Sequence, residues 1–89
     1  MADQEGGKLK PVTPARVAEE LRKLSSMRAS DTIKSDEYEH RFSRMITELR
    51  ERRIDGNRSE ILATLTPLLQ EGVVSAEDWR RLTRQLGLA

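Results

Sequence analysis

Apolar residues recur every three or four positions along most of this chain, a spacing that places them on one face of an α-helix. The first run covers about residues 14–28. Its apolar stripe consists of Val17, Leu21, Leu24 and Met27. Thr13 and Pro14 precede this stripe, and they form a helix start because threonine caps free N–H groups and proline fits the first helical position. The pattern predicts a helix from about 14 to 28.

A second run begins near Ser35, whose hydroxyl we expect to cap the helix. Its stripe consists of Tyr38, Phe42, Met45, Ile46 and Leu49. Asp36 and Glu37 fall in the first turn, where the helix dipole favours negative charge. Arginines close the run, and we expect Gly56 to end the helix.

Two shorter runs follow in the second half of the chain. The stripe of the third consists of Ile61, Leu62, Leu65, Leu68 and Leu69, and that of the fourth consists of Trp79, Leu82 and Leu86. Asn57 and Glu60 have the spacing of a capping box, and Ser75 opens the fourth run in a similar way. Pro67 lies inside the third run, so we expect either a kink there or a new turn of helix that starts at Thr66.

Four helical runs joined by short turns predict an all-α fold. We expect a small bundle of two helical hairpins, residues 13–54 and 57–89. Residues 1–12 lack periodicity and contain two adjacent glycines and a proline, which predicts a disordered N-terminal tail. The composition agrees with helices, since only 3% of the residues are aromatic and 35% are charged.

The two predicted hairpins match when the sequence is shifted by 41 residues. The shift places Leu21 on Leu62, Ile33 on Val74 and Tyr38 on Trp79. Helical periodicity aligns any two hairpins to some extent, but it does not set the equal spacing from the β-branched residue of each turn to the following aromatic residue. A duplication and a chance alignment are both open interpretations of this match.

The second hairpin contains the stretch LLQEGVVSAEDW, which resembles the bacterial short C-terminal domain known as SHOCT. That family has a leucine-spaced helix, a tight turn, and a second helix that opens with acidic residues and an aromatic residue. Here residues 72–75 match the turn and residues 77–79 match the opening. The first hairpin, with DTIKSDEY, is similar but has Asp31 in place of the glycine and Lys34 in place of the capping serine. The resemblance implies a helical hairpin used for association in a bacterial protein, with no catalytic residues.

The residue types that carry most enzyme chemistry are scarce. The chain has no cysteine, which excludes disulfides, thiolate metal sites and cysteine nucleophiles. His40 is the single histidine and lies off the apolar stripe, while the acidic pairs fall in the first turns of helices. No glycine-rich phosphate loop is present. We therefore predict a protein that is not an enzyme and has no metal ion or cofactor.

The hydropathy pattern also bears on location. No apolar run approaches the roughly 20 residues that a membrane span needs. The first residues, MADQEGGKLK, lack the apolar stretch of a signal peptide. These features predict a soluble, cytoplasmic protein.

Two groups of residues are candidates for binding. Leucines in the third run cover more than a narrow stripe, and apolar surface that a core leaves uncovered marks an association surface. The partner-binding candidates are Leu62, Leu65, Leu69 and Trp79. Arginine dominates the basic residues, and its planar fork suits phosphates and carboxylates. The nucleic-acid-binding candidates are Arg50, Arg52, Arg53, Arg58, Arg80, Arg81 and Arg84.

The first interpretation is therefore a protein–protein interaction or oligomerisation module that docks on another protein or on itself. The alternative is a small nucleic-acid-binding or transcription-regulating protein that uses its arginines. A net charge of +1 and few aromatic residues argue against extended nucleic-acid contact. Simpler explanations exist for both groups, because Trp79 also suits a helical core and the arginines also suit solvated helix faces.

Overall fold

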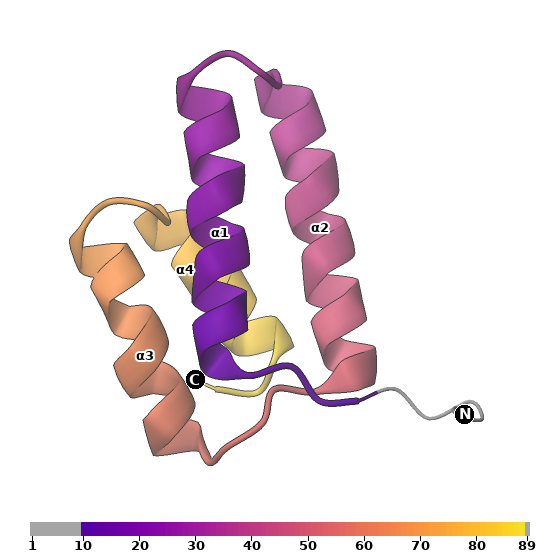
Figure 1. Cartoon of the computed structure of the whole chain (residues 1–89), viewed down its shortest axis with the longest axis vertical. Helices are drawn as coiled ribbons and strands as arrows, with labels where there is room; N and C mark the ends of the chain where they lie inside the picture. Colours follow the sequence, from indigo (N-terminus) through magenta and orange to yellow (C-terminus); the bar gives the residue numbers. More distant parts are fainter. Residues whose placement is uncertain (1–9, 89) are drawn as a thin grey trace.

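A computed structural model describes residues 10–88, and most of the predicted tail, residues 1–9, lies outside these described residues. The chain forms four helices (Figure 1). They are α1 (Pro14–Ala29), α2 (Ser35–Arg52), α3 (Arg58–Gln70) and α4 (Ala76–Gln85). The predicted all-α fold is confirmed, and within the described range the only β-type pairing is one isolated bridge.

The two hairpins pack on each other rather than standing apart. α1 contacts α3 more extensively than it contacts α2, and α2 in turn contacts α4. In Figure 1 the α1–α2 turn and the α3–α4 turn point in the same direction, while the α2–α3 connection crosses the opposite end. The main contact of α1 is therefore with a helix from the other half of the chain.

One apolar core joins all four helices. Its buried members on the helices are Val17, Leu21, Leu24, Tyr38, Phe42, Ile46, Leu49, Ile61, Leu65, Leu68 and Leu82. All of them belong to the stripes that the sequence predicts. The two turns add Ile33 and Val74, and Leu88 closes the core after α4. Each such side chain contributes roughly 1.5–3 kcal/mol when fully buried.

Three of the predicted helix starts are confirmed. The Thr13 hydroxyl accepts the N–H of Arg16 at 3.2 Å. Asn57 and Glu60 form a reciprocal capping box with bonds of 2.8 and 2.9 Å. The hydroxyl of Ser75 likewise accepts the N–H of Asp78 at 3.1 Å.

The predicted cap of α2 is wrong by one residue. Lys34 occupies the cap position with an extended backbone and makes no side-chain cap bond, so Ser35 is already the first helical residue. The buried side chain of Ile33 explains the shift. Its N–H donates to the carbonyl of Met27 at 3.3 Å, which fixes where the turn ends and the helix begins.

Two expectations about helix interruptions also change. α2 ends at Arg52, before Gly56, because Arg53 adopts a positive φ of 72°. α3 continues through Pro67 as one helix and does not restart at Thr66. The carbonyl of Ala63, which Pro67 cannot bond, lies on an exposed residue where water can replace the missing donor.

The two inter-helix turns repeat the same backbone hydrogen bonds. In the first, the N–H groups of Thr32 and Ile33 both donate to the carbonyl of Met27, at 2.8 and 3.3 Å. In the second, Val73 and Val74 donate to Leu68 at 2.9 and 3.2 Å. All of these positions are related by the shift of 41 residues. The left-handed residue of each turn, Asp31 with φ 62° and Gly72 with φ 80°, obeys the same shift.

The end of the predicted tail is held by the rest of the chain. Val12 forms a parallel bridge with Ile54, in which its N–H donates to the carbonyl of Arg53 at 3.0 Å and its carbonyl accepts the N–H of Asp55 at 2.8 Å. Residues 10–12 therefore belong to the folded part of the molecule. The sequence carries no local signal for this pairing.

Candidate functional site

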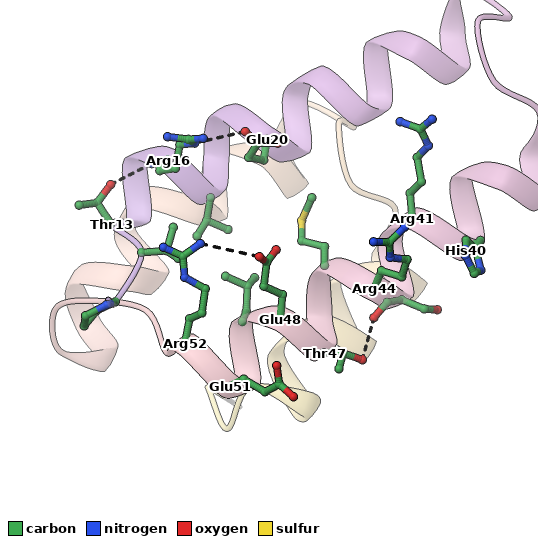
Figure 2. Close-up of a pocket in the computed structure, with 16 residues that line it drawn as sticks. Thr13, Arg16, Glu20, His40, Arg41, Arg44, Thr47, Glu48, Glu51 and Arg52 are labelled. Atoms are coloured by element: carbon green, nitrogen blue, oxygen red, sulfur yellow. Dashed lines mark hydrogen bonds and ion pairs between the residues drawn. The ribbon is translucent and has the colours of Figure 1, made fainter. Parts of the chain in front are cut away.

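An open groove of about 940 Å³ lies between α1 and α2 (Figure 2). Its apolar lining comes from Val17 and Leu49, which are buried, and from Val12 and Met45, which are half-buried. The stripe of α1 faces α3 as well as α2, so α1 and α2 share fewer contacts with each other. The groove is the space that this division leaves on one side of the hairpin.

Charged residues border the groove on both helices. On α1, Arg16 pairs with Glu20 at 3.2 Å, and on α2, Arg52 pairs with Glu48 at 3.7 Å. Figure 2 shows both pairs beside the groove. Each joins residues four apart on one exposed helix face, and such pairs contribute a few tenths of a kcal/mol. A ligand would therefore meet a border with much of its charge already balanced.

Arg44 and His40 lie at the far end of the groove (Figure 2). Both are exposed, and neither forms an ion pair with any residue in the range 10–88. Within the same range, no group of three histidine, aspartate or glutamate side chains is placed to hold a metal ion. His40 thus offers no metal site together with its described neighbours.

A polar network joins α2 to α4 on another side of the bundle. Arg81 donates two hydrogen bonds to the carboxylate of Glu39, at 2.6 and 3.0 Å, and its guanidinium lies 4.8 Å from the centre of the Phe42 ring. The hydroxyl of Tyr38 donates to Asp78 at 3.4 Å. These residues line a second pocket of about 550 Å³. The network links parts of the chain that lie about 40 residues apart.

The protonation states in this network fit a structural role. Burial raises the pKa of Tyr38, and the nearby Asp78 carboxylate raises it further. The hydrogen bonds from Arg81 lower the pKa of Glu39. The phenol therefore stays protonated and the carboxylate stays ionised over the neutral range. Neither group has the pKa near 7 that suits a general acid or base.

The structure divides the predicted partner-binding residues. Leu65 is completely buried between the helices, so its side chain is not accessible to a partner in this fold. Leu62, Leu69 and Trp79 are half-buried. All three pack against the edge of the core and keep part of their surface exposed. The leucine excess of α3 thus serves the contact with α1 first.

The predicted nucleic-acid-binding arginines also divide into groups. Arg52 and Arg81 are paired with glutamates. Four others come from the ends of α2, α3 and α4 and have no acidic partner within residues 10–88. They are Arg50, Arg53, Arg58 and Arg84. Arg50 donates to Gln85 at 3.3 Å and Arg58 donates to the carbonyl of Leu88 at 2.9 Å, so both reach the last turns of the chain beside Arg84. Arg80 is exposed elsewhere on α4.

Sequence reasoning missed the groove and its lining. Val12 was assigned to the tail, and Met45 was counted only as part of a helical stripe. A signal for Val12 does exist, because an apolar residue directly before a helix start often packs against the helix it precedes. No signal of this kind announces that Arg52 donates to the carbonyl of Lys10, 42 residues away, at 3.1 Å.

Two further comparisons bear on function. No helix within residues 10–88 combines the length and the apolar character that crossing a membrane requires. Comparison with family models, with curated proteins and with solved structures finds no match to this chain. Evidence on function therefore comes from the groove, the half-buried apolar residues and the arginines.

Proposed function

We propose that this chain is a non-enzymatic protein–protein interaction module that binds a segment of another protein in the groove between α1 and α2. The observation that carries the proposal is the apolar lining of the groove between borders of paired charges. Grooves of this kind suit a peptide segment that buries a few apolar side chains. The pKa directions at Tyr38 and Glu39, which leave both groups unsuited to proton transfer, support a non-enzymatic role.

The size of the site fits a modest interface. Only four side chains supply its apolar lining, so we expect a transient partner rather than a permanent subunit. The resemblance of both hairpins to the bacterial SHOCT domain supports the same class of role, since that resemblance implies association. We propose a bacterial origin on the same basis.

Capture of partner proteins tests the proposal. Met45 lines the groove and is half-buried, and Met45→Lys places a charge on the groove surface. Met27 is half-buried at the other end of α1 and does not line the groove, so Met27→Lys is a matched control. The tagged wild-type protein and both variants are incubated with lysate, and bound proteins are quantified by mass spectrometry. Circular dichroism establishes that each variant is folded.

We expect the Met45 variant to recover a specific protein about tenfold less than the wild type, which corresponds to about 1.4 kcal/mol of lost binding energy. The Met27 variant should recover it at the wild-type level. Equal recovery by all three proteins would remove the groove from the function. Equal loss from both variants would do the same, because it would reflect general destabilisation.

Nucleic-acid binding is a second candidate function, and the group of four arginines near the end of α4 favours it. Glu51 and Asp55 lie within the same stretch of sequence and weaken the local positive charge. A gel shift over a range of salt concentrations tests the idea with the double variant Arg53→Ala, Arg84→Ala. Loss of both contacts should reduce affinity and make it less dependent on salt. Unchanged binding would exclude these two arginines from any nucleic-acid contact.

A further inference from the structure

Residues 10–12, here called the strap, cross the end of the groove where α1 begins and α2 ends. Val12 is half-buried and forms two backbone hydrogen bonds around Ile54, at 3.0 and 2.8 Å. The Arg52 side chain donates to the carbonyl of Lys10 at 3.1 Å. The strap is thus an extended segment that is bound through its backbone and one apolar side chain.

The strap and the groove form one continuous surface. Pro11, Val12 and Thr13 line the groove together with Arg16, Val17, Leu49 and Arg52. Figure 2 shows Thr13 and Arg52 on either side of this end of the groove. A segment that took the place of the strap could therefore continue between α1 and α2. The strap itself shows which chemistry this end accepts, namely an extended chain with an apolar, β-branched side chain.

The receiving side of this contact is strained. Arg53 accepts the Val12 N–H while it holds φ 72° and ψ 155°, a combination that essentially only glycine adopts without cost. The N–H of Arg53 is also fixed, since it donates to the carbonyl of Leu49 at 2.7 Å. Release of the strap removes one of the two bonds that hold this residue in place. The closed arrangement is therefore less stable than its hydrogen bonds alone would make it.

We propose that the strap occupies a binding site for an extended apolar segment of a partner protein, and that the partner displaces it. This inference rests on the proposed function, because it assigns the class of partner to the same groove. The partner segment places an apolar side chain where Val12 lies. At that position it also has a free N–H, to donate to Arg53, and a carbonyl, to accept from Asp55. Proline at this position is excluded because it has no N–H.

A peptide added in trans tests the proposal. The probe is a fluorescein-labelled peptide of sequence KLKPVT, which corresponds to residues 8–13. Its binding is measured by fluorescence anisotropy on the wild-type chain and on Val12→Gly, in which the internal strap is weakened. The apparent affinity of a site rises with the fraction of molecules in which that site is free. We expect a Kd lower by about threefold or more for Val12→Gly than for the wild type.

Three controls accompany the measurement. Val73→Gly removes another half-buried valine that does not line the groove, and it should keep the wild-type Kd. A peptide in which aspartate replaces the valine should not bind. Amide NMR shifts caused by the peptide should centre on Arg53 and Asp55. Val12→Ala serves as a milder second variant if circular dichroism shows that Val12→Gly is not folded.

Equal Kd values for wild type and Val12→Gly, no binding to either, or NMR shifts away from residues 53–55 would overturn the proposal. The proposed function would survive that result if capture of a partner still depended on Met45. A wild-type chain that sediments as a dimer, and becomes monomeric when the peptide is added, would identify a second copy as the occupant. That outcome would overturn the assignment of the site to a different protein.

Discussion

The backbone of Arg53 leads to a sharp prediction about stability. Its φ of 72° and ψ of 155° fall in a region that is open almost only to glycine. The side chain is exposed and makes no hydrogen bond or ion pair with residues in the range 10–88. Replacing Arg53 by glycine should therefore relieve strain without removing a described contact. We expect Arg53→Gly to stabilise the fold.

The magnitude follows from three opposing contributions. Relief of the strained backbone stabilises by about 1–3 kcal/mol. The greater freedom of glycine in the unfolded chain costs about 0.5–1 kcal/mol. Loss of a positive charge at the end of α2 costs about 0.3–1 kcal/mol. The net expectation is an increase of about 1 kcal/mol in the free energy of unfolding.

Arg53→Ala is the matched control, because alanine also loses the charge but keeps the strain. The difference between the glycine and alanine variants isolates the backbone contribution, and we expect about 1–2 kcal/mol. Urea and thermal unfolding followed by circular dichroism at 222 nm measure it. In a domain of this size each kcal/mol moves Tm by about 4–8 °C. Variants that agree to within about 0.3 kcal/mol would refute the strain at Arg53 and the reasoning built on it.

Three further predictions concern the turns, the core and the network. Gly72→Ala should lower the free energy of unfolding by about 1 kcal/mol in urea melts, because φ is 80° there even though no atom lies within 4 Å of the added Cβ. Leu65→Ala should cost about 2–5 kcal/mol, and the half-buried Leu62→Ala clearly less, as thermal melts will show. Glu39 has a lowered pKa in the fold because Arg81 binds it, so its stabilising contribution is present above its ordinary value of 4.5 and is lost as pH falls below it. Glu39→Gln should therefore weaken the protein at pH 7 and reduce the loss of stability on acidification, as urea melts at pH 7 and pH 3 will measure.

The helices could be predicted from sequence because their causes are local. Apolar spacing places each stripe, and residues such as Thr13, Asn57 and Ser75 bond N–H groups only three positions away. The turns were recognisable for the same reason. Ser35 misled because serine caps well in general, whereas the start of α2 follows from the burial of Ile33.

The candidate site could be predicted only in part, because it depends on contacts between distant residues. The leucines of α3 look alike in sequence, and packing against α1 decides that Leu65 is buried while Leu62 is not. Arg81 looked like a free surface charge until α4 met α2 and Glu39. The positive φ of Arg53 has no sequence signal, since arginine does not mark such positions as glycine does.

The close packing of α1 on α3 has a consequence for how the molecule unfolds. Arrays of repeated hairpins often lose their units one at a time, because each unit touches only its neighbours and has a core of its own. Here the main contact of the first helix lies in the other half, and the ion pairs Arg22–Glu71 and Arg81–Glu39 also connect the halves. Neither hairpin can open without exposing the core of the other. The chain should behave as one cooperative unit with a single unfolding transition, despite a sequence that reads as two copies of one motif.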